Sequence, residues 1–178
     1  SSTTQGAIRY SSAIPFLNYC NGLAWVTIGN DATTNVGLGA FALSASNIGA
    51  ANTAVGTFTL TSNTSGISNT AIGSSALFGN TVGVENTAIG DTALYSNVGK
   101  KQSTAIGFHA MYYADNTAST TTTYNTAVGA FALTGSSTAA NNTGVQNTAL
   151  GSYTLNANTT GGYNTAVGAI ALYSNTTG

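Results

Sequence analysis

The chain has 178 residues and a mass of 17.7 kDa, and only 4% of its residues are charged, against about 25% in ordinary globular proteins. Its net charge of −1 offers no basic field for nucleic acid or anionic lipid. The few titratable groups are scattered along the sequence, whereas acid–base and metal chemistry need them to converge. We therefore expect no enzyme, no cofactor, no metal site, and no nucleic-acid or membrane partner.

Residues 1–30 differ from the rest of the chain and predict a small β-hairpin module. Two apolar runs, Phe16–Cys20 and Leu23–Ile28, flank the dipeptide Asn21-Gly22, which is typical of a tight hairpin turn. Pro15 suits the start of an edge strand. A repeat protein needs a cap over its first repeat, and the aromatic residues expected to form it are Tyr10, Phe16, Tyr19 and Trp25.

An internal repeat organises residues 31–178. The block Asn-Thr-Ala-(Val/Ile/Leu)-Gly-x-x-(Ala/Thr)-Leu recurs at steps of 17, 17, 17, 17, 22, 22 and 17 residues. Helical repeats need about 33 residues or more, and Asn, Thr and Gly disfavour helix. Each period therefore predicts two short strands and two turns, which form one coil of an all-β parallel solenoid. The blocks start at Asn35, Asn52, Asn69, Asn86, Ser103, Asn125, Asn147 and Asn164.

Residues at the same position of successive coils form columns, and two of these columns predict a structural ladder. Stacked Asn amides can hydrogen-bond from coil to coil. A Gly column without exceptions indicates a turn that a Cβ would obstruct. The ladder residues are Asn52, Asn69, Asn86, Asn125, Asn147, Asn164, Gly56, Gly73, Gly90, Gly107, Gly129, Gly151 and Gly168.

Two aliphatic columns are expected to fill the interior. The first is Leu38, Val55, Ile72, Ile89, Ile106, Val128, Leu150 and Val167, and the second is Leu43, Leu60, Leu77, Leu94, Met111, Leu133, Leu155 and Leu172.

An Ala column precedes the first aliphatic column. Because neighbours on a strand face opposite ways, these alanines indicate a second sheltered face, where copies of the chain pack in a trimer. The alternative is that they face water, as small apolar residues often do. The expected trimer-packing residues are Ala54, Ala71, Ala88, Ala105, Ala127, Ala149 and Ala166.

The two 22-residue steps each insert five residues, within 114–124 and within 134–146. Insertions in repeats usually lie on one face, often the binding face, and Tyr offers a flat apolar ring with a polar tip. The alternative is a tolerated change of loop length without a ligand, which costs little free energy. The possible receptor contacts are Tyr112, Tyr113, Asn116, Thr121 and Tyr124.

Three isolated residues have simple interpretations. His109 shares a column with Phe41, Phe58 and Phe131, so we expect a packed or half-exposed ring. The alternative, an ion held by three copies of His109 on a trimer axis, lacks a second ligand type. Lys100 and Lys101 are expected in a solvated turn.

The repeated Asn-Thr-Ala-Ile-Gly-x-x-Ala-Leu, as in residues 69–77 and 86–94, resembles the shaft repeats of bacteriophage tail fibres. It is also similar to the Asn-Ser-Val-Ala-Ile-Gly repeats in the heads of YadA-like trimeric adhesins. The resemblance covers residues 35–178 and implies a homotrimeric left-handed parallel β-roll. Residues 6–26 look like a small β-module that precedes phage fibre shafts.

We therefore expect a structural protein, a trimeric phage tail fibre segment that serves host attachment in the virion. Such a segment would contact other fibre segments end to end and possible host surface glycans or proteins. The alternatives are an extracellular bacterial adhesin head or a self-assembling filament subunit. An ice-binding solenoid is a third class, but its paired Thr array, Thr57-x-Thr59, becomes Ala40-x-Ala42 and Ala130-x-Ala132 in other coils.

Overall fold

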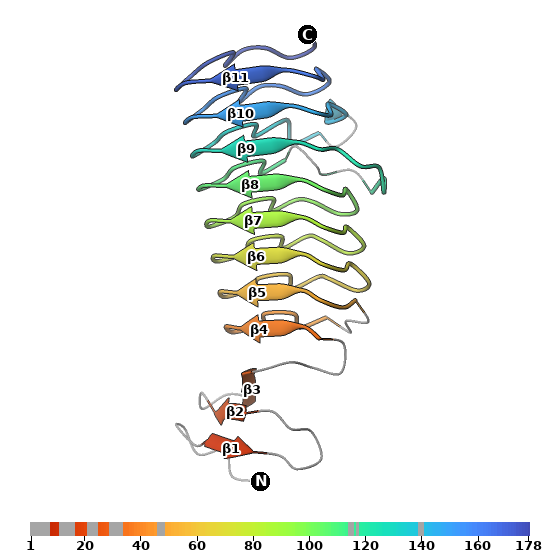
Figure 1. Ribbon diagram of the computed structural model, residues 1–178, viewed down its shortest axis with the longest axis vertical. Helices are drawn as coiled ribbons and strands as arrows, with labels where there is room; N and C mark the ends of the chain where they lie inside the picture. The colour runs from red at the N-terminus through yellow and green to blue at the C-terminus, as the bar shows by residue number, and fades with distance from the viewer. Residues whose placement is uncertain are drawn as a thin grey trace.

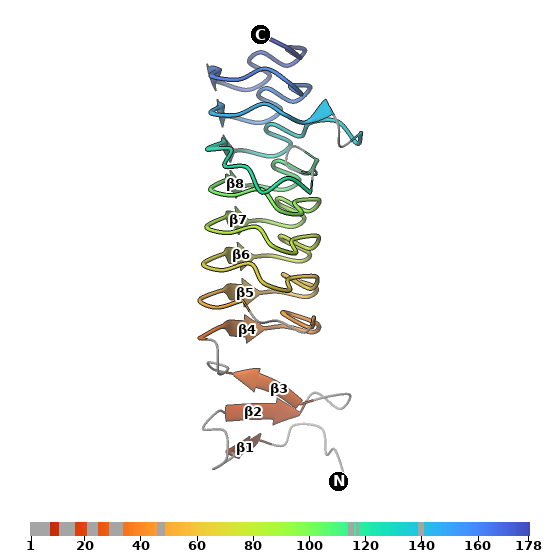
Figure 2. The same ribbon diagram turned by 90° about the vertical axis from the view of Figure 1, so that its right-hand side faces the viewer.

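The structure, a computed structural model, describes residues 8–10, 17–20, 25–28, 34–45, 49–113, 116, 118–138 and 141–178. It is an elongated β-solenoid in which short parallel strands stack along one axis (Figure 1). Figure 2 shows the same coils from the side, one above the other. The predicted all-β parallel solenoid is confirmed.

A separate three-stranded antiparallel sheet lies at the N-terminal end. It consists of β1 (Ile8–Tyr10), β2 (Leu17–Cys20) and β3 (Trp25–Ile28) in that order. The predicted hairpin is present as β2–β3, in which Cys20 pairs with Trp25. The start of the second predicted run, Leu23 and Ala24, lies outside the described residues. Asn21-Gly22, Pro15 and the side chains of the expected cap lie outside the described residues.

The long sheet has one strand per coil, and its order follows the sequence from β4 to β11. Every pairing is in register with the repeat, so that Ala54 pairs with Ala71 and Ala105 with Ala127 across a 22-residue step. Its strands are β4 (Val36–Leu38), β5 (Thr53–Val55), β6 (Thr70–Ile72), β7 (Thr87–Ile89), β8 (Thr104–Ile106), β9 (Thr126–Val128), β10 (Thr148–Leu150) and β11 (Thr165–Val167).

The prediction of two strands per coil was wrong, because turns replace the second strand. Three columns of non-Gly residues adopt left-handed φ values between 49° and 64°, each at a cost of about 1–2 kcal/mol. These residues still bond to adjacent coils: the amides of Phe58, Leu60 and Ser68 donate to the carbonyls of Ala40 (2.9 Å), Ala76 (3.1 Å) and Ala50 (3.0 Å). Hydrogen bonds between coils therefore offset the strain and continue around the coil without β geometry.

The interior is narrow and is filled by small and medium-sized side chains. Ala71 on the strand and Ala76 and Leu77 on the opposite wall are fully buried, and together with their columns they form one continuous core. Thr59 takes the place of Ala76 in its own coil, where its Oγ1 donates to the carbonyl of Gly73 (2.9 Å). Of the two aliphatic columns, only the second, from Leu60 to Leu155, fills the interior as predicted.

The assignment of the first aliphatic column to the interior was wrong. Its members alternate with the buried alanines along each strand, so they face outwards; Ile72 is 39% exposed and Leu150 45%. The physical reason is the width of the coil, in which Leu77 already occupies the space opposite the strand.

The assignment of the Ala column to packing between copies fails for the same reason. Ala54, Ala71, Ala88, Ala105, Ala127 and Ala149 are fully buried and Ala166 is 4% exposed within a single chain. They belong to the core of the coil, and the face available to another chain is the opposite one.

Two glycines of β4 and its turn provide a matched test of this arrangement. A Cβ on Gly37 would lie 3.5 Å from Leu43 Cδ1, an ordinary contact, whereas a Cβ on Gly39, at φ 139°, would overlap the carbonyl oxygen of Gly56. We predict that Gly37→Ala stabilises the protein by about 0.5–1 kcal/mol and that Gly39→Ala destabilises it by more than about 2 kcal/mol. Urea unfolding midpoints measure both, and equal effects would contradict the packing.

Candidate functional site

The repeated Asn residues form the ladder that the sequence indicates. The backbone amide of Asn69 donates to Asn52 Oδ1 (3.0 Å), and Asn69 Nδ2 donates both to Asn52 Oδ1 (3.0 Å) and to the carbonyl of Gly83 (2.8 Å). The same pattern joins Asn147 to Asn125 across a 22-residue step. Each amide therefore holds two coils in register inside the molecule, where it is shielded from water.

A second amide ladder lies nearby and was not foreseen from the sequence. Asn80 Nδ2 donates to Asn63 Oδ1 (2.8 Å), and Asn97 Nδ2 donates to Asn80 Oδ1 (2.9 Å). Asn80 Nδ2 also reaches the carbonyl of Gly83 (3.2 Å), which thus accepts from both ladders. The signal was present in the spacing Asn-x-x-Gly-x-x-Asn, which gives each such coil one Asn of either ladder. The carbonyl of Gly83 accepts from Asn80 of its own coil and from Asn69 of the preceding one, whereas Asn86 donates to the carbonyl of Lys100.

Ser103, the one exception in the first ladder, has its own partner. Its backbone amide donates to Asn86 Oδ1 (3.0 Å), and its Oγ lies 2.5 Å from Thr123 Oγ1. Thr123 belongs to the first lengthened coil. The insertion therefore supplies the polar group that meets the shorter side chain.

Removal of one ladder amide should be costly. Asn69→Ala leaves the backbone amide and Nδ2 of Asn86 without their acceptor, Asn69 Oδ1. Since an unsatisfied buried polar group costs about 1–3 kcal/mol, we predict a loss of about 3 kcal/mol in the free energy of unfolding. Urea unfolding tests it, with Ser65→Ala at an exposed position as the control. A loss no larger than that of the control would contradict a stabilising ladder.

Lys100 occupies a position at which neighbouring coils have Gly. A Cβ on Gly66 or Gly83 would overlap polar atoms of the two adjoining coils, among them the carbonyls of Gly83 and Lys100 respectively. Lys100 is nevertheless only 5% exposed, and its Nζ donates to Thr121 Oγ1 (2.8 Å). The expectation of a solvated turn was wrong for Lys100, because the lengthened next coil makes room for its side chain.

The two insertions meet, as their adjacent coils require. Asn142, which is 2% exposed, donates through Nδ2 to the carbonyl of Tyr113 (2.7 Å) and to Asn116 Oδ1 (2.8 Å). Its Oδ1 accepts from the backbone amide of Ser136 (2.9 Å). The chain near Asn142 extends beyond the outline of the regular coils (Figure 2), and this buried amide ties it to the preceding coil.

The link between Lys100 and the first insertion can be tested by a double-mutant cycle. Deleting residues 114–118 returns that coil to 17 residues and should bring its backbone against the Lys100 side chain. We predict that the deletion lowers the melting temperature strongly and that Lys100→Gly, added to the deletion, restores most of the loss.

Lys100→Gly alone is the third variant of the cycle. Thermal unfolding of the three variants and the parent gives the coupling. Additive effects of the two changes would contradict the accommodation of Lys100 by the insertion.

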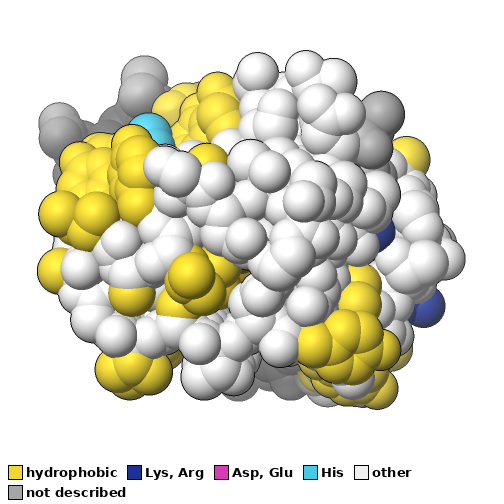
Figure 3. All heavy atoms as spheres, turned by 90° about the horizontal axis from the view of Figure 1, so that it is seen from above, with side chains coloured by type: hydrophobic (Ala, Val, Ile, Leu, Met, Phe, Trp, Pro, Cys, Tyr) yellow, Lys and Arg dark blue, Asp and Glu magenta, His cyan; other side chains and the backbone are white. Residues whose placement is uncertain are grey.

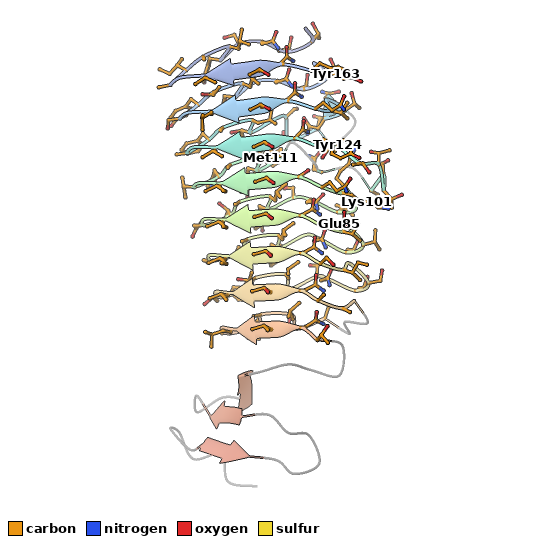
Figure 4. The ribbon with its side chains drawn as sticks, viewed as in Figure 1. Glu85, Lys101, Met111, Tyr124 and Tyr163 are labelled. Carbon is orange, nitrogen blue, oxygen red and sulfur yellow. The ribbon has the colours of Figure 1, made fainter. Side chains whose placement is uncertain are left out.

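The five predicted receptor contacts divide into three groups. Tyr112, Tyr113 and Asn116 lie on the side joined by Asn142, whereas Thr121 contacts Lys100. Tyr124 lies elsewhere, 56% exposed; Figure 4 places it on the edge of the solenoid that also carries Glu85, Lys101 and Tyr163, with Met111 inside the coil. The structure therefore does not bring the five residues into one site.

Tyr112 instead belongs to a series of stacked rings that we call the aromatic band. Tyr95 stacks on Phe78 and on Tyr112 with ring centroids 5.0 and 4.8 Å apart. Within one coil Tyr112 stacks on His109 (4.5 Å), and Phe131 and Tyr153 continue the series. Viewed down the solenoid, hydrophobic side chains gather around the single imidazole at one rim, and the Lys side chains lie at the opposite rim (Figure 3). The band consists of Phe78, Tyr95, His109, Tyr112, Phe131 and Tyr153.

His109 is half-buried in this band, as its column predicts. The Tyr112 hydroxyl has a pKa raised above its ordinary value of 10.0, first by partial burial and then by Tyr95 and Tyr113. The sequence signal for the band is the aromatic residue directly after the interior Leu or Met, as in Phe78, Tyr95 and Tyr112.

The outer face of the long sheet is a second regular surface. It consists of the first aliphatic column and of the residue two positions before it, which is Thr on β5 to β11 and Val36 on β4. Both positions alternate with the inward-facing small residue of the strand. No charged residue belongs to either column. Five of the aliphatic members are exposed, among them Leu38 (46%), Ile106 (36%) and Val167 (67%), and the other three are half-buried. The Thr members are Thr53, Thr70, Thr87, Thr104, Thr126, Thr148 and Thr165.

Neither a metal centre nor a membrane span is present in the described part of the chain. Three or more His, Cys, Asp or Glu residues do not gather anywhere within it. Its residues also contain no helix with the length and apolar character needed to cross a bilayer. Comparison with known protein families, with curated proteins and with solved structures finds no match to this chain.

Proposed function

We propose that this protein is a structural segment of a trimeric fibre, of the type found in phage tail fibre shafts, which carries or displays host attachment. The observation that carries the proposal is the outer face of the long sheet. It is regular and uncharged, and its aliphatic side chains are exposed or half-buried on all eight strands. Contiguous exposed apolar surface of this kind marks an interaction site in soluble proteins.

The solenoid supports a mechanical role. Eight strands at about 4.8 Å per step give a rod of about 35 Å, and two amide ladders fix its register. Since the strands β5 to β11 share the pattern Thr-Ala-aliphatic, a second and third copy can lie parallel at the same coil height. The resemblance of the repeat to fibre shafts favours three chains, and closed rotational symmetry would then cover the face of each copy.

The same surface also suits the head of a bacterial surface adhesin or a filament subunit, which the repeat resembles as well. These alternatives share the mechanism, self-association of a rigid solenoid, and differ in the structure that carries it. Under this proposal the protein acts on a virion or at a cell surface, and its partners are further copies and fibre segments.

Association through the outer face can be tested by charge. We predict that the parent chain sediments at about 53 kDa, three times its 17.7 kDa, and that Ile72→Lys with Ile106→Lys reduces it to the mass of one chain, because buried unpaired charges are costly at an interface. The matched control, Ile67→Lys with Tyr163→Lys, places the same charges at exposed positions away from the sheet (45% and 79%).

Sedimentation equilibrium at several concentrations gives these masses, and circular dichroism shows that each variant is folded. A parent that stays at 17.7 kDa would refute the proposal, as would a control that dissociates together with the sheet variant.

A further inference from the structure

The aromatic band is not required by the solenoid. The columns that hold Phe131 and Tyr95 contain Ser75 and Thr61 in other coils, and those coils pair with the same register. The interior is already filled by the Ala and Leu columns. The presence of these aromatic rings is therefore not explained by the requirements of the fold.

The rings are stacked on their neighbours but keep surface for a partner. The six residues of the band are half-buried or, for Tyr153, 40% exposed. Their centroids follow one another at 4.5–5.2 Å across five coils, a length of about 19 Å at about 4.8 Å per coil. The result is a narrow strip of partly exposed aromatic rings along the rod.

The phenol hydroxyls of the band, and that of Tyr113 beside it, are available to a partner. Among the described residues, no hydrogen bond is made by the hydroxyls of Tyr95, Tyr112, Tyr113 or Tyr153, although the hydroxyl of a buried Tyr usually finds a partner. The columns of the band also hold Ser75, Thr92 and Thr134, and Asp91 precedes Thr92. The strip thus combines rigid aromatic surface with free hydroxyl groups and almost no charge, a combination that recognition surfaces use.

We infer that the aromatic band binds an extended, neutral polysaccharide along the axis of the solenoid. Sugar rings have apolar C–H faces that pack on aromatic rings, and their hydroxyls can exchange hydrogen bonds with the phenol groups. A linear polymer of such units repeats along its length as the band does. An anionic polymer would find no Lys beside the aromatic band, because the Lys side chains lie at the opposite rim (Figure 3).

The two insertions lie next to the aromatic band and fix the chain there. Asn142 bonds to the carbonyl of Tyr113, beside Tyr112, so the lengthened coils hold the chain at the edge of the band. The inference deepens the proposed function by naming the chemistry of the attached surface, and it assigns attachment to Tyr95 and Tyr112 in place of Tyr124 and Thr121.

Affinity electrophoresis tests the inference with three defined probes: hydroxyethylcellulose, which is neutral and extended, dextran, which is neutral and flexible, and alginate, which is extended and anionic. We expect the full chain to be retarded most by hydroxyethylcellulose, without dependence on salt, because no charges are involved. Tyr95→Ala with Tyr112→Ala should weaken retardation about tenfold or more. Tyr163→Ala, which removes an exposed ring (79%) outside the band, should leave retardation unchanged.

A second measurement uses only the parent chain. Nitration by tetranitromethane followed by mass spectrometry should show Tyr95, Tyr112 and Tyr113 protected by hydroxyethylcellulose and Tyr163 not protected. Retardation by alginate alone, equal loss in the Tyr163 variant, or no protection in the band would each overturn the inference. Sedimentation of the parent distinguishes the two proposals: a trimeric parent that binds no polysaccharide refutes only this one, whereas polysaccharide binding by a monomeric parent refutes only the trimer. The Tyr95/Tyr112 variant should lose binding and keep the sedimentation mass of the parent.

Discussion

The whole structure depends on hydrogen bonds that run from one coil to the next, and the buried Asn amides are their most demanding part. Asn69 Oδ1 accepts two bonds from Asn86 while its own Nδ2 donates to two other groups. An amide in this position satisfies buried polar atoms that no water reaches. Because each bond joins the same position of two successive coils, whether these are 17 or 22 residues apart, the ladder permits only one register. The sheet, the core and both surfaces inherit their regularity from it.

The narrow coil then decides which side chains face inwards. With Leu77 on one wall, only Ala fits on the strand opposite, so the larger Ile and Val are turned outwards. This gives the molecule a small core and an unusually apolar exterior with little charge. The outer face of the long sheet and the aromatic band are therefore two surfaces on which a weakly charged rod can meet partners, the first suited to copies of itself and the second to a neutral polymer.

The architecture could be predicted from the sequence because the same block of residues recurs in every coil. Eight aligned blocks identify the columns, and the role of Gly at Gly56 or Gly90 follows from the close approach of the next coil. The sequence did not predict which face of the strand is inside, because Ala54 and Val55 are both apolar and periodicity alone does not distinguish them. The width of the coil decides this, and width depends on turns such as those at Phe58 and Leu60, whose left-handed geometry has no signature in ordinary residue preferences.

The candidate site was predicted only in part, since proximity in the sequence does not follow the geometry of the coil. Tyr112 and Tyr124 are separated by one lengthened loop, yet the first joins the rings of adjacent coils and the second points elsewhere. The columns define the neighbours of Tyr112: Tyr95 lies one period before it. The band is therefore predictable from residues one period apart and not from residues close together in the sequence.

The left-handed residues also bear on how such a molecule can form. An isolated coil would carry three unfavourable backbone conformations. Without the carbonyls of an adjacent coil, no hydrogen bonds would offset their cost, so a single coil would not be stable in this conformation. A finished coil presents those partners already in place. Assembly should then advance by templated growth from an existing end, with each new coil copying the one beneath it, and the antiparallel sheet β1–β3 next to β4 is well located to supply the first template.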